Sequence, residues 1–154
     1  MGTYQCGYFG SSVPILYVFE AESAKQDQYR LSGFERKTVG TDFICITKFR
    51  NVCAHGERLF TYKTADSIGD LLLHKKLNIP VKRNTYQYGK NDLFAVVISL
   101  RYVLPKDDFL IFKKQLSDLI KKLVSATSLT ENDILSAMGF PSNWKKITLY
   151  RKIS

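Results

Sequence analysis

The segment Arg50-Asn51-Val52-Cys53-Ala54-His55 contains the residue types that a phosphodiester-cleaving site needs. Cleavage of RNA through its own 2′-hydroxyl requires a base for that hydroxyl, an acid for the departing 5′-oxygen and positive charge on the phosphate. A histidine side chain, which ordinarily titrates near pH 6.5, performs either proton transfer, and arginine binds phosphate through paired hydrogen bonds. Arg50 and His55 are therefore the candidate catalytic residues, and Asn51 is a candidate for orienting the imidazole or a phosphate oxygen.

The spacing of these residues constrains how they cooperate. On a helix, Asn51 and His55 share one face because they are four residues apart, whereas Arg50 and His55 are separated by roughly 140° around the axis. Two arrangements would bring them together: a helix that unwinds near Gly56, or a twofold dimer that supplies two copies of Arg50 and His55. Arg58 is a further candidate for RNA binding, and it joins the cluster if the helix persists through Gly56.

A structural interpretation of the same residues stays open. A histidine near a helix C-terminus often only satisfies terminal carbonyls and the helix dipole. Arg50 has Asp42 and Glu57 as alternative ion-pair partners. Because an arginine and a histidine at fixed separation form a short pattern with many chance matches, the spacing alone does not establish catalysis.

A basic segment without acidic residues lies between Asp70 and Asp92. It also holds Tyr86 and Tyr88 and is interrupted by Pro80 and Gly89. The candidate RNA-binding cations of this segment are Lys75, Lys76, Lys82, Arg83 and Lys90. Such a segment is suited to contacting phosphates and stacking on unpaired bases. A solvated connection with a short hairpin explains the same composition equally well.

The periodicity of apolar residues predicts an all-α bundle of four or five helices, with the basic loop region between the central helices. Thr41 is a candidate cap for the helix that carries Arg50, and Asn91 and Asp92 precede a buried helix over residues 93–104 that Pro105 ends. A buried strand over residues 94–98 remains an alternative. Residues 14–24 are a weaker helix candidate.

Two further helices are expected in the C-terminal half. Asp107 or Asp108 is the candidate start of an amphipathic helix with an apolar stripe and a lysine-rich face. Ser128 and Glu131 have the spacing of a capping box for the last helix, which is expected to stop at Gly139. Trp144 and Ile147 are expected to anchor the tail. We therefore divide the chain into an N-terminal segment, 1–40, irregular or partly helical, and a helical domain, 41–154.

Composition limits the function classes. The formal charge of +9 and pI near 9.5 favour a polyanionic partner. No uncharged apolar run approaches the roughly 20 residues that span a bilayer, so we expect a cytoplasmic protein that does not enter the membrane. The three cysteines lack the close pairs of zinc sites or disulfide frameworks. We therefore expect no metal and no cofactor, with Cys45 and Phe49 packed in the core.

The candidate motif resembles a longer signature, that of the Abi-like abortive-infection family of bacterial phage-defence proteins, which belongs to the HEPN superfamily. The resemblance covers residues 43–147. The matching segments are Phe49–Phe60, Leu73–Leu77, Tyr88–Ala95 and Gly139–Trp144. Members are usually longer at the N-terminus, and residues 1–40 match only around Lys25 to Leu31, so the resemblance implies a member truncated at this end.

The resemblance implies a HEPN-like bundle whose arginine, following polar residue and histidine form a metal-independent ribonuclease site at a dimer interface. Arg50, Asn51 and His55 match that pattern. The expected function is thus an endoribonuclease in abortive infection or a toxin-like system, acting on tRNA or mRNA as a homodimer, with an antitoxin or regulatory partner. The alternative is a non-catalytic HEPN module that binds RNA or a partner protein through the same helix face and the basic segment from Lys75 to Lys90.

Overall fold

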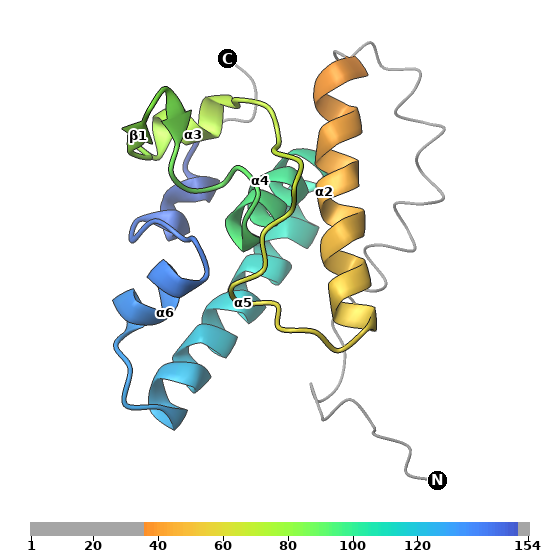
Figure 1. Cartoon of the computed structure of the whole chain (residues 1–154). Coiled ribbons are helices and arrows are strands. Elements are labelled where there is room, and N and C mark those ends of the chain that lie inside the picture. Colours follow the sequence, from red (N-terminus) through yellow and green to blue (C-terminus); the bar gives the residue numbers. More distant parts are fainter. Residues whose placement is uncertain (1–35, 151–154) are drawn as a thin grey trace, which may run out of the picture.

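The structure is a computed structural model that describes residues 36–150, with side chains described from residue 43 onward. Its elements are α2 (Arg36–Ala54), α3 (Leu72–Lys76), β1 (Val81–Lys82), β2 (Thr85–Tyr86), α4 (Leu93–Val103), α5 (Lys106–Ala126), α6 (Glu131–Ala137) and the 3₁₀-helix η1 (Trp144–Thr148). Figure 1 shows α4 in the middle, with α2 on one side and α6 with the hairpin on the other. The described part of the chain is therefore the mainly helical bundle that its sequence predicts.

Helix α4 forms the centre of the core. The eight residues from Phe94 to Arg101 are all buried, as expected for a helix that is apolar on nearly every face. Asp92 caps it by accepting a hydrogen bond from the N–H of Ala95 at 3.0 Å. The chain turns to an extended conformation at Leu104, which precedes proline. The predicted helix is confirmed, and the alternative of a strand over residues 94–98 is wrong.

Helix α2 begins at Arg36, so the start predicted at Thr41 is wrong. Residues that cap helices are also tolerated inside them, because most intrinsic helix preferences differ by less than about 1 kcal/mol. The boundary predicted between residues 40 and 41 consequently falls inside α2. The helix predicted over residues 14–24 lies outside the described residues.

Helix α5 begins at Lys106, with Pro105 as the N-cap and without a side-chain cap. Asp107 and Asp108 therefore lie in the first turn, not at the cap as predicted. Their negative charges are favourable at this position because the amide groups of the first turn carry partial positive charge. The apolar stripe packs inward, and its most buried members are Phe109, Phe112 and Ile120.

The capping box of α6 consists of Thr130 and Asp133, so the prediction of Ser128 and Glu131 is wrong. The N–H of Asp133 donates to Thr130 Oγ1 at 3.2 Å, and the N–H of Thr130 donates to Asp133 Oδ2 at 3.0 Å. Both pairs have the required spacing of three residues. The Thr130 pair forms the cap because it places Ile134 and the following leucine in the core.

The segment from α3 to α4 is held by hydrogen bonds to both backbone groups of Gly89. Its N–H donates to both carboxylate oxygens of Asp92 at 3.0 Å, and its carbonyl lies 2.7 Å from His74 Nε2. We call this arrangement of His74, Gly89 and Asp92 the Gly89 bridge. Gly139, after α6, also touches it: a Cβ there would lie 2.6 Å from Asp92 Oδ2.

The tail closes the core beyond α6. Trp144 and Ile147 have no exposed surface, which confirms that they anchor the tail. The Phe140 ring contacts Phe94 of α4 at a centroid distance of 4.9 Å and Trp144 at 5.4 Å. Aromatic packing therefore joins the α6 loop to the central helix.

The close approach of Gly139 to Asp92 leads to a stability prediction. Gly56 and Gly139 have positive φ angles of 66° and 75°, but a Cβ at Gly56 would meet nothing within 4 Å. Gly56→Ala therefore measures the conformational penalty alone, of about 1–2 kcal/mol. We expect Gly139→Ala to reduce the free energy of unfolding in urea by at least about 1 kcal/mol more than Gly56→Ala. Equal losses would contradict the tight packing around Asp92.

Candidate functional site

Helix α2 ends just before His55 in a Schellman motif. The N–H of Glu57 donates to the carbonyl of Val52 at 3.1 Å, and the N–H of Gly56 donates to that of Cys53 at 3.2 Å. Gly56 has a φ of 66°, the left-handed conformation that this motif uses and that glycine adopts without steric cost. The predicted end of the helix at Gly56 is confirmed.

This regular end excludes unwinding ahead of Gly56. The N–H of His55 donates to the carbonyl of Asn51 at 2.9 Å, which is the normal helical hydrogen bond. The two residues are therefore one helical turn apart, as predicted. Arg58 lies beyond the helix, so the arrangement in which a continued helix aligns it with His55 is wrong.

The three candidate catalytic side chains are exposed at the end of α2. Arg50 Nη1 donates a long hydrogen bond of 3.4 Å to Asn51 Oδ1, so the guanidinium leans toward the side of the helix that Asn51 occupies. Within residues 43–150, Arg50 forms no ion pair and the His55 imidazole has no hydrogen-bond partner. The pairing of Arg50 with Glu57 is therefore absent from the described side chains, whereas the pairing with Asp42 lies outside them.

The opposite face of α2 anchors this helix end. Its buried side chains are Cys45, Ile46, Phe49 and Val52. The Phe49 ring meets Tyr62 edge to face at a centroid distance of 5.1 Å, and Lys48 pairs with Asp66. These contacts attach the segment after α2 back onto the helix. Core packing of Cys45 and Phe49 is confirmed, and burial of their face leaves Arg50, Asn51 and His55 outward.

The basic segment folds into α3 and the hairpin. Arg83 and Asn84 form its two-residue turn with φ angles of 50° and 62°, as in a type I′ turn. The candidate cations that are exposed and have no ion-pair partner within residues 43–150 are Lys75, Lys76, Lys82 and Arg83. Tyr86 stacks on His74 with ring centroids 4.9 Å apart, so this face of its ring is already occupied.

Lys90 does not belong to this exposed set. Its side chain is only 12% exposed, and its ammonium binds Asp70 Oδ1 at 2.6 Å and the carbonyl of Ile68. The assignment of Lys90 to RNA binding is thus not supported. By binding Asp70 and the carbonyl of Ile68, the Lys90 ammonium instead holds the loop before α3 in place.

The two candidate sets are not neighbours in one chain. Figure 1 shows the C-terminal end of α2 and the segment with α3 and β1 on different sides of the bundle. The expectation that a binding module combines the outer face of α2 with the basic loop therefore requires an RNA that reaches around the molecule or a second copy of the chain.

His74 and Asp92 are the titratable groups that sequence reasoning did not single out as partners. His74 has no exposed surface. Its Nδ1 accepts from the N–H of Leu71 at 3.0 Å, so the proton of the neutral ring is on Nε2, which donates to Gly89. Burial lowers the pKa of His74 and raises the pKa of Asp92 to about 6. Because neither is accessible, both stabilise the fold and do not meet a substrate.

Burial of Asp92 predicts a pH dependence. Its pKa of about 6 exceeds the ordinary aspartate value of 3.8, so the folded chain retains a proton that the unfolded chain loses between these pH values. This stabilising contribution is fully present below about pH 4 and is lost as the pH rises through 6. From pH 4 to 7, the free energy of unfolding of the wild type is expected to fall by about 2–3 kcal/mol relative to the Asp92→Asn protein.

Urea titrations at both pH values measure this difference. The Asp118→Asn protein, changed at a carboxylate on the surface of α5, serves as the control and should follow the wild type. Parallel pH dependences of the wild type and the Asp92→Asn protein would contradict the raised pKa.

Within the described residues, no group of three or more histidine, cysteine or acidic side chains could hold a metal ion. None of the helices described is both long and apolar enough to cross a membrane. Comparison of the chain with protein-family models, with curated proteins and with solved structures finds no match.

Proposed function

We propose that this protein is an endoribonuclease that cleaves RNA by attack of the 2′-hydroxyl on the adjacent phosphate. The observation that carries the proposal is the exposure of Arg50, Asn51 and His55 together at one regularly ended helix terminus. Exposed groups that make no ion pair with residues 43–150, of the types needed for acid, base and phosphate binding, favour a catalytic role.

Each step of the reaction has a candidate group. An imidazole removes the proton of the 2′-hydroxyl, whose oxygen bonds to phosphorus and forms a 2′,3′-cyclic phosphate. The bond from phosphorus to the 5′-oxygen breaks, and a protonated imidazole supplies the proton to that oxygen. Arg50 would neutralise the phosphate oxygens, with Asn51 holding its guanidinium. The proposed chemistry uses no metal ion.

A twofold dimer supplies the second imidazole. The candidate motif contributes one histidine per chain, and His74, the other histidine, is fully buried. A base and an acid that are both histidine consequently require two copies of His55. A twofold axis near the end of α2 would place both copies and both arginines around one phosphate. The homodimer is thus part of the proposal.

The cellular role is proposed from the family resemblance. An RNA-cleaving member of the Abi-like group would act in the cytoplasm during phage infection or as a toxin, on tRNA or mRNA, under the control of an antitoxin or another regulatory partner. The net charge of +9 is consistent with a polyanionic substrate.

A second candidate function is RNA binding without cleavage. It is favoured by the exposed cations of α3 and the hairpin, which lie away from the end of α2. A module of this kind would bind RNA through the hairpin and leave it intact. The two functions differ in whether the RNA is cleaved and in whether that cleavage depends on His55.

Cleavage assays test the proposal directly. Purified protein is incubated with tRNA and with mRNA in a chelator, and 5′-labelled products are resolved on a denaturing gel. We expect His55→Ala and Arg50→Ala each to reduce the cleavage rate by at least about 100-fold, since loss of acid-base catalysis typically costs about 10²–10⁴ and loss of one electrostatic stabiliser about 10²–10³. Cys53→Ala changes an exposed side chain of the same turn and should retain the wild-type rate. Equal cleavage by the wild-type and His55→Ala proteins would refute the proposal.

Mixed proteins test the shared site. If both copies of His55 serve one phosphate, an equal mixture of wild-type and His55→Ala chains retains roughly a quarter of the activity, because only wild-type homodimers are active. Independent sites would retain about half. The chains are mixed, partially unfolded in urea and refolded to exchange subunits, and activity is measured at constant total protein. Retention of half the activity would exclude a composite site.

A further inference from the structure

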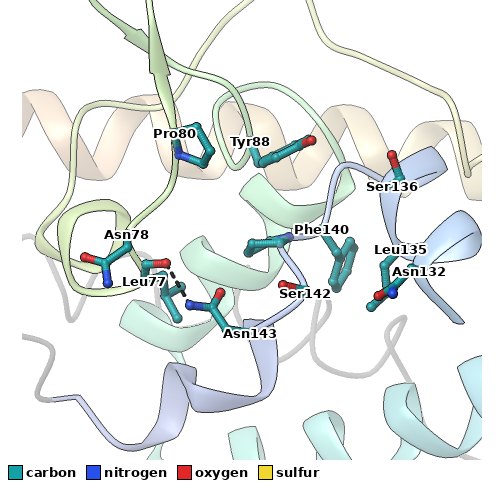
Figure 2. Close-up of a pocket in the computed structure, with 11 residues that line it drawn as sticks. Leu77, Asn78, Pro80, Tyr88, Asn132, Leu135, Ser136, Phe140, Ser142 and Asn143 are labelled. Carbon is teal, nitrogen blue, oxygen red and sulfur yellow. Dashed lines mark hydrogen bonds between the residues drawn. The ribbon is translucent and has the colours of Figure 1, made fainter.

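An open groove lies between the hairpin segment and α6, apart from the proposed catalytic residues. It has a volume of about 400 Å³. Figure 2 shows Pro80 and Tyr88 along one side, Phe140 in the middle, and Asn132 and Ser136 of α6 on the other side. Aromatic and apolar groups therefore form the interior, while amides and hydroxyls lie at the edges.

The groove is held open by contacts that belong to the fold. Asn143 Nδ2 donates to the carbonyl of Leu77 at 2.9 Å, which joins its two walls at one end. Phe140 is 3% exposed and is fixed by its ring contacts with Phe94 and Trp144. The Gly89 bridge fixes the residue after Tyr88. A binding site of this kind loses little conformational entropy when a ligand enters.

Charge around the groove favours an anionic ligand. The wall with Asn78 and Pro80 belongs to the segment whose exposed cations, without an ion pair inside residues 43–150, are Lys75, Lys76, Lys82 and Arg83. On α6, beside the lining residue Asn132, Glu131 pairs with Lys145 at 2.7 Å and Asp133 accepts the hydrogen bond that closes the helix cap. Exposed cations thus lie within a few residues of the groove lining on this side, and one of the two carboxylates of α6 is paired with a lysine.

We propose that this groove binds one unpaired nucleotide of RNA, with its base beside Tyr88 and Phe140 and its flanking phosphates on the cations of α3 and the hairpin. Every base offers a flat face for aromatic contact and an edge with donors and acceptors. The amides of Asn78 and Asn132 provide both donors and acceptors at the rim. A peptide of acidic residues alone would use the cations but brings no flat ring to the aromatic interior.

The inference rests on RNA as the partner but does not depend on cleavage by His55. Binding is therefore measured with the His55→Ala protein, which leaves the RNA intact under the proposed function. The probes are a fluorescein-labelled single-stranded RNA of eight nucleotides and a ribose-phosphate oligomer of equal length without bases. Fluorescence anisotropy gives the dissociation constant of each.

Two exposed serines provide a matched pair of variants. Ser136 and Ser125 each precede the last residue of their helices, α6 and α5, but only Ser136 lines the groove. We expect Ser136→Glu to weaken RNA binding at least about fivefold through repulsion of the phosphates, and Ser125→Glu to change it less than about twofold. Equal effects of the two substitutions would overturn the proposal.

A second variant tests the base contact. Tyr88→Leu retains apolar volume but removes the aromatic face, so it should weaken binding of the RNA at least about fivefold and leave the oligomer without bases unaffected. Thermal unfolding monitored by circular dichroism checks its fold. Equal affinity of the wild-type groove for both probes, or displacement of the RNA by an oligoglutamate peptide at lower concentration than by unlabelled RNA, would refute the nucleotide site. If the Ser136→Glu protein binds RNA normally while cleavage still depends on His55, the nucleotide site in the groove is refuted and the proposed ribonuclease function is not.

Discussion

The Gly89 bridge is the interaction on which the arrangement of this protein depends. Gly89 donates its backbone N–H to the cap of the central helix, and its carbonyl accepts a hydrogen bond from a buried histidine of α3. A Cβ at Gly89 would lie 2.6 Å from Ile98 Cδ1, and the φ of 75° is one that glycine adopts without steric cost, so glycine favours this close approach. Gly139 likewise lacks the Cβ that would lie 2.6 Å from Asp92 Oδ2. The bridge therefore places α3, α4 and the end of α6 relative to one another.

Ionisable groups in the bridge are tolerated because every one has backbone partners. Buried polar groups without hydrogen bonds cost about 1–3 kcal/mol each, whereas His74 and Asp92 are held by the peptides of Leu71, Gly89 and Ala95. A neutral imidazole and a carboxyl with a raised pKa avoid most of the penalty of a buried charge. The directional hydrogen bonds of the bridge thus fix the position of α3 relative to α4, which apolar packing alone does not specify.

The two candidate functional surfaces arise from different parts of this architecture. The end of α2 is presented by burial of Phe49 and Val52 on the opposite face and by a glycine-terminated helix. The groove is presented by the bridge and by the aromatic contacts of Phe140. Since the surfaces lie on different sides of the bundle, one RNA strand would contact both only by following the surface or by crossing to a second chain. Separation of recognition from chemistry is consistent with the two proposals.

The sequence by itself determined the features that local physics controls. Apolar periodicity was sufficient to identify α4 and the amphipathic α5, and glycine at positions 56 and 139 marked helix ends because left-handed backbone favours it. Helix starts were less predictable, since Thr41, Asp107 and Ser128 are acceptable caps but also fit inside or outside a helix. Only the tertiary structure decided which charged groups are free. Lys90 and Lys82 look alike in the sequence, yet Asp70, twenty residues from Lys90, binds one and leaves the other exposed. The same holds for the two histidines. Long-range packing buries His74 and leaves His55 at the surface, and only a histidine at the surface is accessible to a substrate.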